Sequence, residues 1–456
     1  MGSDFDVATD VLVVGAGACG LAAAIAAHDA DADVAMVEKM ARPGGNSALS
    51  TGSIPAAGSR FQREAGIDDD PGRMVADLMR LSGRHDCEAL TRCLAEQSAS
   101  LVEWLVDRIG ARLTLITDYC HVGHSVPRLH APRSRRGQDL IDDLLEAVAG
   151  RGIPLALGNA VSELIVEEGA IVGAKVGSDR IGAGKVVLAV NGFAANRDLV
   201  RRWCPDIAAA EYFGALGSTG EAMLWGEALG AGLANMGAYQ GYAAVAHPEG
   251  SLLSWTTIEK GGILVGADGR RFGNEDLGYS GFAPLVMAQG TFAYAVYDAR
   301  IHEIACLEDE YAELAGMGGV RHADAPLELA ALMAIEGDGL RATLDAWAAA
   351  ARGERADDFG RRSFGLAPLS PRYAIARVKP GLFHTQGGLL VDDQARVLRR
   401  DGRPIPNLFA GGGAAGGISG RSGAEGYASG NGLLTALGLG RIAGLAAALE
   451  VRAAAR

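Results

Sequence analysis

The sequence predicts an α/β protein in which a domain built on a parallel sheet is interrupted by an inserted α+β domain. Three observations support this. Apolar strands alternate with helical patterns from Val11 to about Val190. Between about residues 239 and 382 the chain changes to short strands, aromatic side chains and helices such as Glu328–Arg352. From His384 onward strands return, and Asn407–Ala410 enters a glycine-rich turn.

The first strand–helix–strand unit carries a phosphate-binding pattern. An apolar strand runs into Gly15-Ala-Gly17-Ala-Cys-Gly20, an alanine-rich helix follows, and Glu38 ends a second apolar strand. Gly15 permits the tight turn, Gly17 lets the backbone approach a pyrophosphate, and Gly20 lets the helix pack on the strand. Glu38 is placed to accept hydrogen bonds from ribose hydroxyls and would repel a 2′-phosphate. The unit therefore predicts a Rossmann-like, dinucleotide-binding domain that disfavours NADP.

Size, charge and composition exclude several classes of function. The chain has 456 residues, enough for two or three domains, and its net charge of −13 without a Lys/Arg block argues against nucleic-acid binding. Its six cysteines form no Cys-x-x-Cys pair, so we expect no haem, zinc or other metal site. Met1–Asp10 is polar and gives no signal peptide, and the apolar stretch Leu433–Leu449 is short and contains Arg441. We therefore expect a cytoplasmic protein without a membrane span.

These patterns also place the domain boundaries. The first part of the sheet-based domain is expected over residues 1–238, the inserted capping domain over 239–382, and the C-terminal part of the sheet-based domain over 383–456. Within the first part, Gly152–Leu157, Ala170–Val176 and Lys185–Val190 are predicted strands.

A series of short motifs follows the first glycine cluster along the chain. They are Gly44-Gly-Asn-Ser47, Ala189-Val-Asn-Gly-Phe193, Ala246-His-Pro248, Gly261-Gly-Ile-Leu-Val265, Arg271-Phe-Gly-Asn-Glu-Asp276, His384-Thr-Gln-Gly-Gly388, Leu408-Phe-Ala-Gly-Gly412 and Ser429-Gly-Asn-Gly432. In this order and spacing the chain resembles, over nearly its whole length, the flavoprotein family of soluble fumarate reductases, succinate dehydrogenase flavoprotein subunits and 3-ketosteroid dehydrogenases. The resemblance implies a Rossmann-like FAD-binding domain with an inserted capping domain, and an FAD-dependent oxidoreductase acting on CH–CH bonds.

The resemblance also implies which residues bind FAD. The adenine half would lie on the first strand–helix–strand unit, residues 44–52 would run along the pyrophosphate and isoalloxazine, and the start of the last helix would face the flavin N1/O2 edge. Relatives that bind FAD covalently carry a histidine in the second segment, where this chain has Asn46, so we expect non-covalent FAD. The expected set is Gly15, Gly17, Ala18, Gly20, Glu38, Lys39, Gly45, Asn46, Ser47, Ser50, Thr51, Gly52, Ala160, Val161, Asn191, Gly192, Gly411, Gly412, Gly430, Asn431 and Leu433.

The chain departs from the resemblance at the substrate site. The histidines of fumarate reductases are matched by His247 and His384, but their arginines are not matched. The proton-delivering arginine falls near Tyr279 and a substrate-binding arginine near Tyr427, while a short insertion separates Arg421 from the match. Arginine clamps a carboxylate through two hydrogen bonds, whereas tyrosine presents a single phenol. Ketosteroid dehydrogenases have tyrosines at the flavin, and one branch has a Gly-Tyr-x-Ser-Gly sequence like residues 426–430.

We therefore expect an enzyme that introduces a C=C bond next to a ketone, on a steroid-like or cyclic keto-acid substrate. Tyr427 would bond the ketone oxygen, Tyr279 would take the α-proton with Ser429 as a relay, and the β-hydrogen would leave as hydride to flavin N5. The two tyrosines could exchange roles. The alternatives are a fumarate-like reductase of an activated C=C bond that uses an external electron donor, and a flavin-binding protein without turnover. Either enzyme needs a small ketone or enone substrate and a separate electron acceptor or donor.

Several basic residues leave open whether the substrate carries an acidic group. His247 and His384 suit an acidic substituent, although packing roles remain the alternative for both histidines and for both tyrosines. One further stretch is either a solvated basic loop or, if it faces the pocket, a reason to expect a keto-carboxylate. It contains His121, His124, His130, Arg128, Arg133, Arg135 and Arg136.

Overall fold

Two units make up the computed structural model, which describes residues 5–118, 120–290 and 292–454. Unit 1 comprises Met1–Pro205, Gly214–Tyr239 and His384–Arg456, and unit 2 comprises Asp206–Phe213 and Gln240–Phe383. The chain passes from one unit to the other after Pro205, after Phe213, within β12 (Gly237–Ala246) and within β16 (Tyr373–Thr385). Each unit is described below by itself.

Unit 1 is built on a largely parallel sheet. Its strands lie in the order β19 (Pro404–Ala410), β9 (Asp179–Leu188), β1 (Val7–Val14), β2 (Val34–Glu38) and β6 (Leu155–Leu157). Val11 at the centre pairs with Val34 on one side and with Lys185 on the other. Antiparallel β18 (Arg396–Leu398) extends the β19 edge, and the hairpin of β7 (Val161–Glu167) and β8 (Ala170–Val176) attaches to β9. The predicted α/β fold with a Rossmann-like sheet is confirmed.

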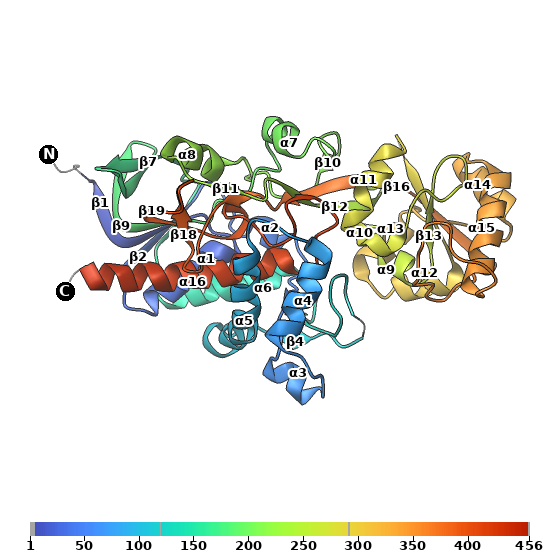
Figure 1. Cartoon of the computed structure of the whole chain (residues 1–456), viewed down its shortest axis with the longest axis horizontal. Helices are drawn as coiled ribbons and strands as arrows, with labels where there is room; N and C mark the ends of the chain where they lie inside the picture. Colours follow the sequence, from blue (N-terminus) through green and yellow to red (C-terminus); the bar gives the residue numbers. More distant parts are fainter. Residues whose placement is uncertain (1–4, 119, 291, 455–456) are drawn as a thin grey trace. The chain divides into compact units, whose positions relative to one another are not determined.

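Helices α1 (Ala18–His28) and α16 (Asn431–Ala454) lie side by side in unit 1 (Figure 1). Glycine makes this contact possible, because a Cβ at Gly440 would lie 2.3 Å from the carbonyl oxygen of Cys19. A Cβ at Gly444 would lie 2.0 Å from the carbonyl oxygen of Ala23. α16 is long and apolar enough to cross a membrane by length and composition, but 67% of its most apolar window is buried inside the unit. That burial is typical of a core helix.

The remaining elements of unit 1 are short sheets and the helices around them. The short strands are β3 (Ile54–Pro55), β4 (Leu113–Leu115), β5 (Leu129–Pro132), β11 (Leu233–Ala234), β17 (Gly388–Leu389) and β20 (Ser422–Gly423). The helices are α2 (Gly45–Ala48), α3 (Arg60–Glu64), α4 (Pro71–Ser82), α5 (Glu88–Trp104), the π-helical turn Leu105–Ile109, α6 (Gly137–Gly150), α7 (Arg197–Trp203), α8 (Glu221–Leu229) and the turn Gly412–Ala414.

Unit 2 centres on an antiparallel arrangement of β13 (Ile263–Val265), β14 (Ala293–Asp298) and β16. The short strands β10 (Glu211–Tyr212) and β15 (Arg321–Ala323) also pair with β16. Its other helices are α9 (Thr256–Glu259), the turn Glu275–Leu277, α10 (Gly278–Gly281), α11 (Ala283–Ala288), α12 (Ala299–Ala305) and α13 (Asp309–Gly316). Trp347 lies in the buried core and donates from Nε1 to the carbonyl oxygen of Gly261 at 3.1 Å.

The single helix expected over Glu328–Arg352 is wrong. The chain forms two helices there, α14 (Pro326–Met333) and α15 (Gly337–Ala351). They separate at Ala334, which adopts a left-handed φ of 55°. Apolar residues of both helices contribute to the same buried core. The apolar periodicity in the sequence therefore continues through the turn at Ala334, and for this reason it does not reveal that the helix ends there.

Replacing Gly444 by alanine is expected to destabilise unit 1. The added Cβ would meet the backbone of α1 rather than a movable side chain, and overpacking of this kind costs about 1–3 kcal/mol. Thermal or urea unfolding would measure the loss. Gly150→Ala at the end of α6 is the control, because no atom lies within 4 Å of its added Cβ. Equal unfolding midpoints for the two variants would contradict this account of the α1–α16 contact.

Glu259 makes the stability of the protein depend on pH. Burial raises the pKa of this carboxyl to about 7, so folding disfavours its charged form. The free energy of unfolding is therefore undiminished by Glu259 below the ordinary pKa of about 4.5. It falls as pH rises through about 7, because the buried carboxyl must then ionise. Glu259→Gln should therefore unfold at a higher temperature than the wild type at pH 8, and the difference should vanish below pH 4.5. Glu313→Gln, an exposed site on α13, should show no such dependence.

Candidate active site

The start of α1 is shaped for an anion. Gly15 has a left-handed φ of 108°, and a Cβ there would lie 2.3 Å from the carbonyl oxygen of Ala189. Gly17 caps α1 without any side-chain hydrogen bond, and the first turn holds no acidic residue. The amide of Gly44 donates to the carbonyl oxygen of Ala16 at 2.9 Å, which joins the segment 44–52 to this loop. Uncapped amides at a helix start fit a phosphate.

Glu38 lies at the end of β2, next to this loop. Its Oε2 accepts from the amide of Ala16 and its Oε1 from the amide of Met40, both at 2.8 Å. Each oxygen retains a lone pair that a ribose hydroxyl can use. The amide of Asn159 donates to the carbonyl oxygen of Glu38 at 2.8 Å. This bond places Asn159, which directly precedes Ala160 and Val161, beside the end of β2.

Lys39, also expected at the cofactor, is engaged within the protein. Its Nζ lies 2.5 Å from Oε1 of Glu221 and 2.7 Å from Oγ1 of Thr219. This pair links the end of β2 to the start of α8. The side-chain charge of Lys39 is therefore paired within unit 1.

Residues 44–52 form a short helix and a turn with unsatisfied polar capacity. Oδ1 of Asn46 accepts from the amide of Ala215 at 2.6 Å, while Nδ2 is buried without a partner among the described residues. An orphaned buried donor is costly unless a ligand satisfies it. The hydroxyls of Ser50 and Thr51 turn inward to Ser47 and Ser53, at 2.7 and 2.9 Å. This segment fits a cofactor that bears hydrogen-bond acceptors.

The glycines expected after β9 and β19 serve close packing. A Cβ at Gly192 would lie 2.3 Å from Oγ1 of Thr385, and one at Gly411 would lie 2.7 Å from Sγ of Cys19. Gly412 also lies against Cys19, whose thiol pKa burial raises to about 12. Nδ2 of Asn191 donates to Ser218 at 2.8 Å. The contacts of Gly411 and Gly412 hold the end of β19 against α1, while those of Asn191 and Gly192 join the segment after β9 to Ser218 and Thr385.

Tyr427 and His384 converge on the first turn of α16. Their ring centroids lie 5.5 Å apart with the planes at 73°. A Cβ at Gly432 would lie 3.3 Å from Nε2 of His384 and 3.5 Å from the phenol oxygen of Tyr427. Nearby, Oδ1 of Asn431 is buried without a partner among the residues described. The start of α16 thus gathers a phenol, an imidazole and an unsatisfied amide.

His384 is neutral near pH 7. Burial lowers its pKa to about 4. Its Nδ1 lies 3.1 Å from Nε2 of Gln386 and 3.4 Å from the carbonyl oxygen of Thr385. The tautomer with the proton on Nε2 accepts from Gln386 and can donate a hydrogen bond on the Tyr427 side, whereas the tautomer with the proton on Nδ1 donates to Thr385.

The basic stretch divides into a buried part and an exposed part. The amide of Ser429 donates to the carbonyl oxygen of Val122, and Nε2 of His124 donates to the carbonyl oxygen of Ser429, both at 2.9 Å. Residues 121–124 thus lie against the Tyr427–Gly430 segment. Burial lowers the pKa of His121 to about 3 and that of His124 to about 4. As a whole, the stretch is not the solvated loop that was one expectation.

Arg128 and His130 stabilise the conformation of this basic stretch through ion pairs and hydrogen bonds. Arg128 is fully buried and pairs with Asp69 at 2.7 Å and Asp77 at 2.6 Å. The ring of His130 bonds Ser59 at 2.9 Å and the carbonyl oxygen of Arg128 at 2.8 Å. These groups satisfy one another and are structural. Arg133 and Arg136 are exposed, whereas Arg135 is half-buried.

Arg421 is directed elsewhere. Its guanidinium lies 2.6 Å from Oδ1 of Asp86, and its side chain is 67% exposed. It therefore does not replace the arginine that the resemblance places near Tyr427.

Tyr279 lies in unit 2, within an aromatic cluster that sequence reasoning missed. It stacks on Tyr242 with ring centroids 5.3 Å apart, and Trp255 lies 6.4 Å from it. Tyr242 donates from its phenol to the carbonyl oxygen of Leu253 at 3.0 Å, and burial raises its pKa well above the ordinary value. Tyr242 therefore stays protonated. Its position in an aromatic-rich apolar strand was the available signal.

His247 has different neighbours from Tyr279. Its ring lies 4.7 Å from that of Phe292, its amide donates to the carbonyl oxygen of Arg377 at 3.0 Å, and its carbonyl oxygen accepts from Nε of Arg377 at 3.3 Å. No described contact joins His247 to the cluster of Tyr242 and Tyr279. The structure does not bring these predicted residues of unit 2 together.

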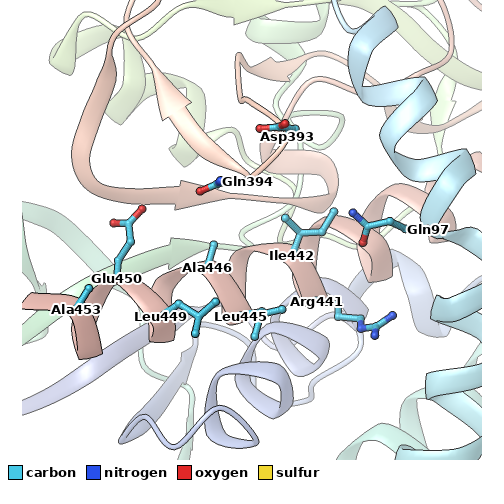
Figure 2. A pocket seen from close by; sticks show the side chains of 10 residues that line it. All are labelled: Gln97, Asp393, Gln394, Arg441, Ile442, Leu445, Ala446, Leu449, Glu450 and Ala453. Atoms are coloured by element: carbon cyan, nitrogen blue, oxygen red, sulfur yellow. The ribbon is translucent and has the colours of Figure 1, made fainter.

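A pocket of about 440 Å³ lies along α16 (Figure 2). It is lined by Gln97, Asp393, Gln394, Arg441, Ile442, Leu445, Ala446, Leu449, Glu450 and Ala453. None of the predicted catalytic or cofactor residues is among them. This groove is separate from the polar groups at the first turn of α16.

Comparison with known proteins identifies a family and several relatives. The family described as FAD binding domain matches residues 10–432. The NADH:fumarate oxidoreductase of Klebsiella pneumoniae (strain 342) is 33% identical over 453 residues, covering 97% of this chain and 48% of that protein. The chain thus spans about half the length of that relative.

Two solved structures share the fold over 98% of this chain. The open conformation of a flavocytochrome c3 fumarate reductase has a TM-score of 0.82 at 29% identity, and 79% of that chain is covered. The 3-ketosteroid-Δ4-(5α)-dehydrogenase from Rhodococcus jostii RHA1, in complex with 4-androstene-3,17-dione, has a TM-score of 0.79 at 26% identity, and 98% of that chain is covered. The chain is therefore similar both to a reductase and to a dehydrogenase.

Removing the Arg421 guanidinium should not affect carboxylate binding. Arg421→Ala breaks one exposed ion pair, and such pairs contribute about 0–1 kcal/mol. We expect the affinity for fumarate, measured by titration of the flavin absorbance, to change by less than about twofold. Arg403→Ala, which breaks the exposed pair with Asp401, is the control. A tenfold loss confined to Arg421→Ala would make Arg421 a substrate ligand.

Proposed function

The chain belongs to the FAD binding domain family and is an FAD-dependent oxidoreductase, and from this premise we propose that it introduces a C=C bond α,β to the ketone of a cyclic substrate. The observation that carries the proposal is the convergence of the Tyr427 phenol and Nε2 of His384 on the first turn of α16. The phenol is a hydrogen-bond donor, and burial keeps the imidazole uncharged near pH 7. They suit a carbonyl oxygen better than a carboxylate.

The absence of a clamp at this place supports a ketone. The two arginine positions implied by the resemblance hold Tyr279 and Tyr427, and Arg421 is paired with Asp86. Binding a dicarboxylate without the pair of arginines that the resemblance implies would leave its two charges poorly compensated in a buried site. A neutral carbonyl carries no such cost.

The residues of the proposed site divide the work as follows. Tyr427 donates a hydrogen bond to the ketone oxygen, which makes the α-hydrogen more acidic. From the sequence resemblance alone, Tyr279 is assigned the role of taking the α-proton, with Ser429 as a relay, and exchange of the two phenols is the alternative assignment. In the tautomer that carries the proton on Nε2, His384 also donates to the carbonyl. When bound, FAD supplies the two-electron acceptor for the β-hydrogen and its electron pair.

The FAD is proposed to be held non-covalently by the groups described above. The uncapped start of α1 would bind the phosphates, Glu38 the ribose, and the orphaned Nδ2 of Asn46 an acceptor on the cofactor. Asn46 provides no nucleophile for a covalent bond. A separate electron acceptor would complete each turnover.

A second candidate is reduction of an activated C=C bond with an external electron donor. The names of the Klebsiella pneumoniae relative and of the flavocytochrome structure favour it. The same donors could bind the carbonyl of an enone. Dehydrogenation of the ketone and reduction of the enone are one reaction run in opposite directions, so both use the same groups. Which compounds react with the flavin distinguishes the dehydrogenase from the reductase.

An anaerobic flavin spectrum tests the proposal. Oxidised protein receives cyclic ketones and keto-acids, and chemically reduced protein receives enones and fumarate. Bleaching of the oxidised flavin by a saturated ketone supports the dehydrogenase. Reoxidation by fumarate without any response to ketones would replace it by the reductase, and failure of every compound would indicate a flavin-binding protein without turnover.

Tyr427→Phe should retain FAD and lose activity. The substitution removes one phenolic hydroxyl, and a single positioned donor contributes about a hundredfold or more in rate. The rate of flavin bleaching by the preferred ketone is the measurement. Tyr373→Phe, at the edge of the core of unit 2, is the matched control and should leave the rate unchanged. A rate for Tyr427→Phe within about threefold of the wild type would refute the role of Tyr427.

A further inference from the structure

We propose that Arg135 binds a carboxylate on the substrate, so that the preferred ketone is a cyclic oxo-acid rather than an uncharged steroid. The inference rests on the proposed function for the ketone chemistry, but the anion site itself stands on the contacts of Arg135. Each of these contacts lies within unit 1.

Arg135 has unused hydrogen-bonding capacity. Its Nη2 lies 3.3 Å from Oγ of Ser53, while its Nε is buried and has no partner among the described residues. A buried guanidinium N–H without an acceptor costs free energy that a bound carboxylate would recover. Its side chain is half-buried, so a ligand can still reach it.

The charge of Arg135 is also uncompensated. Arg128 in the same stretch is neutralised by Asp69 and Asp77, and Arg112 pairs with Asp143 at 2.6 Å. Across the described part of the chain, no carboxylate lies within 4 Å of Arg135. A half-buried cation of this kind is stabilised by an anion that the protein itself does not provide.

The backbone holds Arg135 in an uncommon conformation. Its φ is 56°, in the left-handed region that non-glycine residues rarely adopt. The amide of Arg135 donates to the carbonyl oxygen of Pro132 at 2.9 Å, which closes the turn that fixes this conformation. Exposed Arg133 and Arg136, in the same loop, have no ion pair among the residues described. The strained residue is therefore the one whose side chain turns inward.

Contacts lead from Arg135 to the proposed ketone site. Ser53, the partner of Arg135, has its carbonyl oxygen 3.0 Å from where a Cβ of Gly430 would lie. Gly430 follows Ser429 and directly precedes α16, on whose first turn Tyr427 and His384 converge. Arg135 also lies close enough to His121 to lower the pKa of that imidazole, with burial as the larger cause. A ring bound at Tyr427 could thus present a carboxylate to Arg135.

The test compares an acid with its neutral analogue. The probes are 4-oxocyclohexanecarboxylate and its methyl ester, and the variants are Arg135→Gln, Arg135→Lys and the control Arg133→Gln. Dissociation constants come from perturbation of the oxidised flavin absorbance, kcat and KM from anaerobic bleaching, and FAD content and unfolding temperature are measured for each variant. Arg133 is exposed and lies outside the described contacts of the site.

The expected result is a selective loss. Arg135→Gln should weaken binding of the acid about ten- to hundredfold and change binding of the ester by less than about threefold. Arg135→Lys should restore part of the affinity, because lysine keeps the charge but not the fork of donors. Arg133→Gln should behave as the wild type, and FAD content should be unchanged in all three variants.

Three results would overturn the proposal. They are equal losses for acid and ester, loss of FAD from Arg135→Gln, and no preference of the wild type for the acid. The second would assign Arg135 to the cofactor. If the acid binds through Arg135 but no ketone bleaches the flavin, the anion site stands and the proposed dehydrogenase fails. If only neutral ketones bleach it, the dehydrogenase stands and the anion site fails.

Discussion

The backbone contact between α1 and α16 is the constraint on which unit 1 depends. Gly440 and Gly444 bring the two helices closer than any side chain would allow. The contact fixes the starts of both helices relative to the sheet. One start carries the glycine turn suited to a phosphate, and the other carries the turn on which Tyr427 and His384 converge. The proposed cofactor site and the proposed substrate site in unit 1 therefore both depend on this helix contact.

The sequence predicts most of what depends on local pattern. The first strand–helix–strand unit, β8 and the strand before the Gly411 turn follow from short-range periodicity and glycine spacing. The division between α14 and α15 does not, because apolar residues continue through the turn at Ala334. Apolar periodicity and glycine spacing predict that a helix or strand exists. They predict its ends poorly when the segments before and after a turn pack on the same core.

Long-range pairing decides the parts of the site that the sequence does not reveal. Arg421 pairs with Asp86, which lies 335 positions away, and no local pattern announces that choice. The burial of residues 121–124 against Ser429 is equally remote in sequence. Tyr242 is visible only as one aromatic residue in an apolar strand. In each case a tertiary contact determines whether a polar side chain serves a ligand, a neighbour or the solvent.

The electrostatic character of the candidate site follows from burial. His121, His124 and His384 all have pKa values well below neutrality because their charged forms are poorly solvated. They therefore act as neutral donors and acceptors rather than as cations. Besides the amides at the start of α16, attraction for an anion in this part of unit 1 comes from a guanidinium, whose charge burial does not readily remove.

The self-contained neutralisation of Arg128 has a consequence for how such a protein can diverge. Because Asp69 and Asp77 neutralise this buried cation inside the fold, the conformation of the loop around Arg128 does not depend on a bound ligand. Residues at the loop's inner turn can then be exchanged in descendants without unfolding it. Under the proposed function, a lineage can shift the ring substituent it accepts through single substitutions there, while Tyr427 and His384, the groups proposed to face the carbonyl, remain as they are. Selectivity and chemistry are thus free to evolve at separate positions.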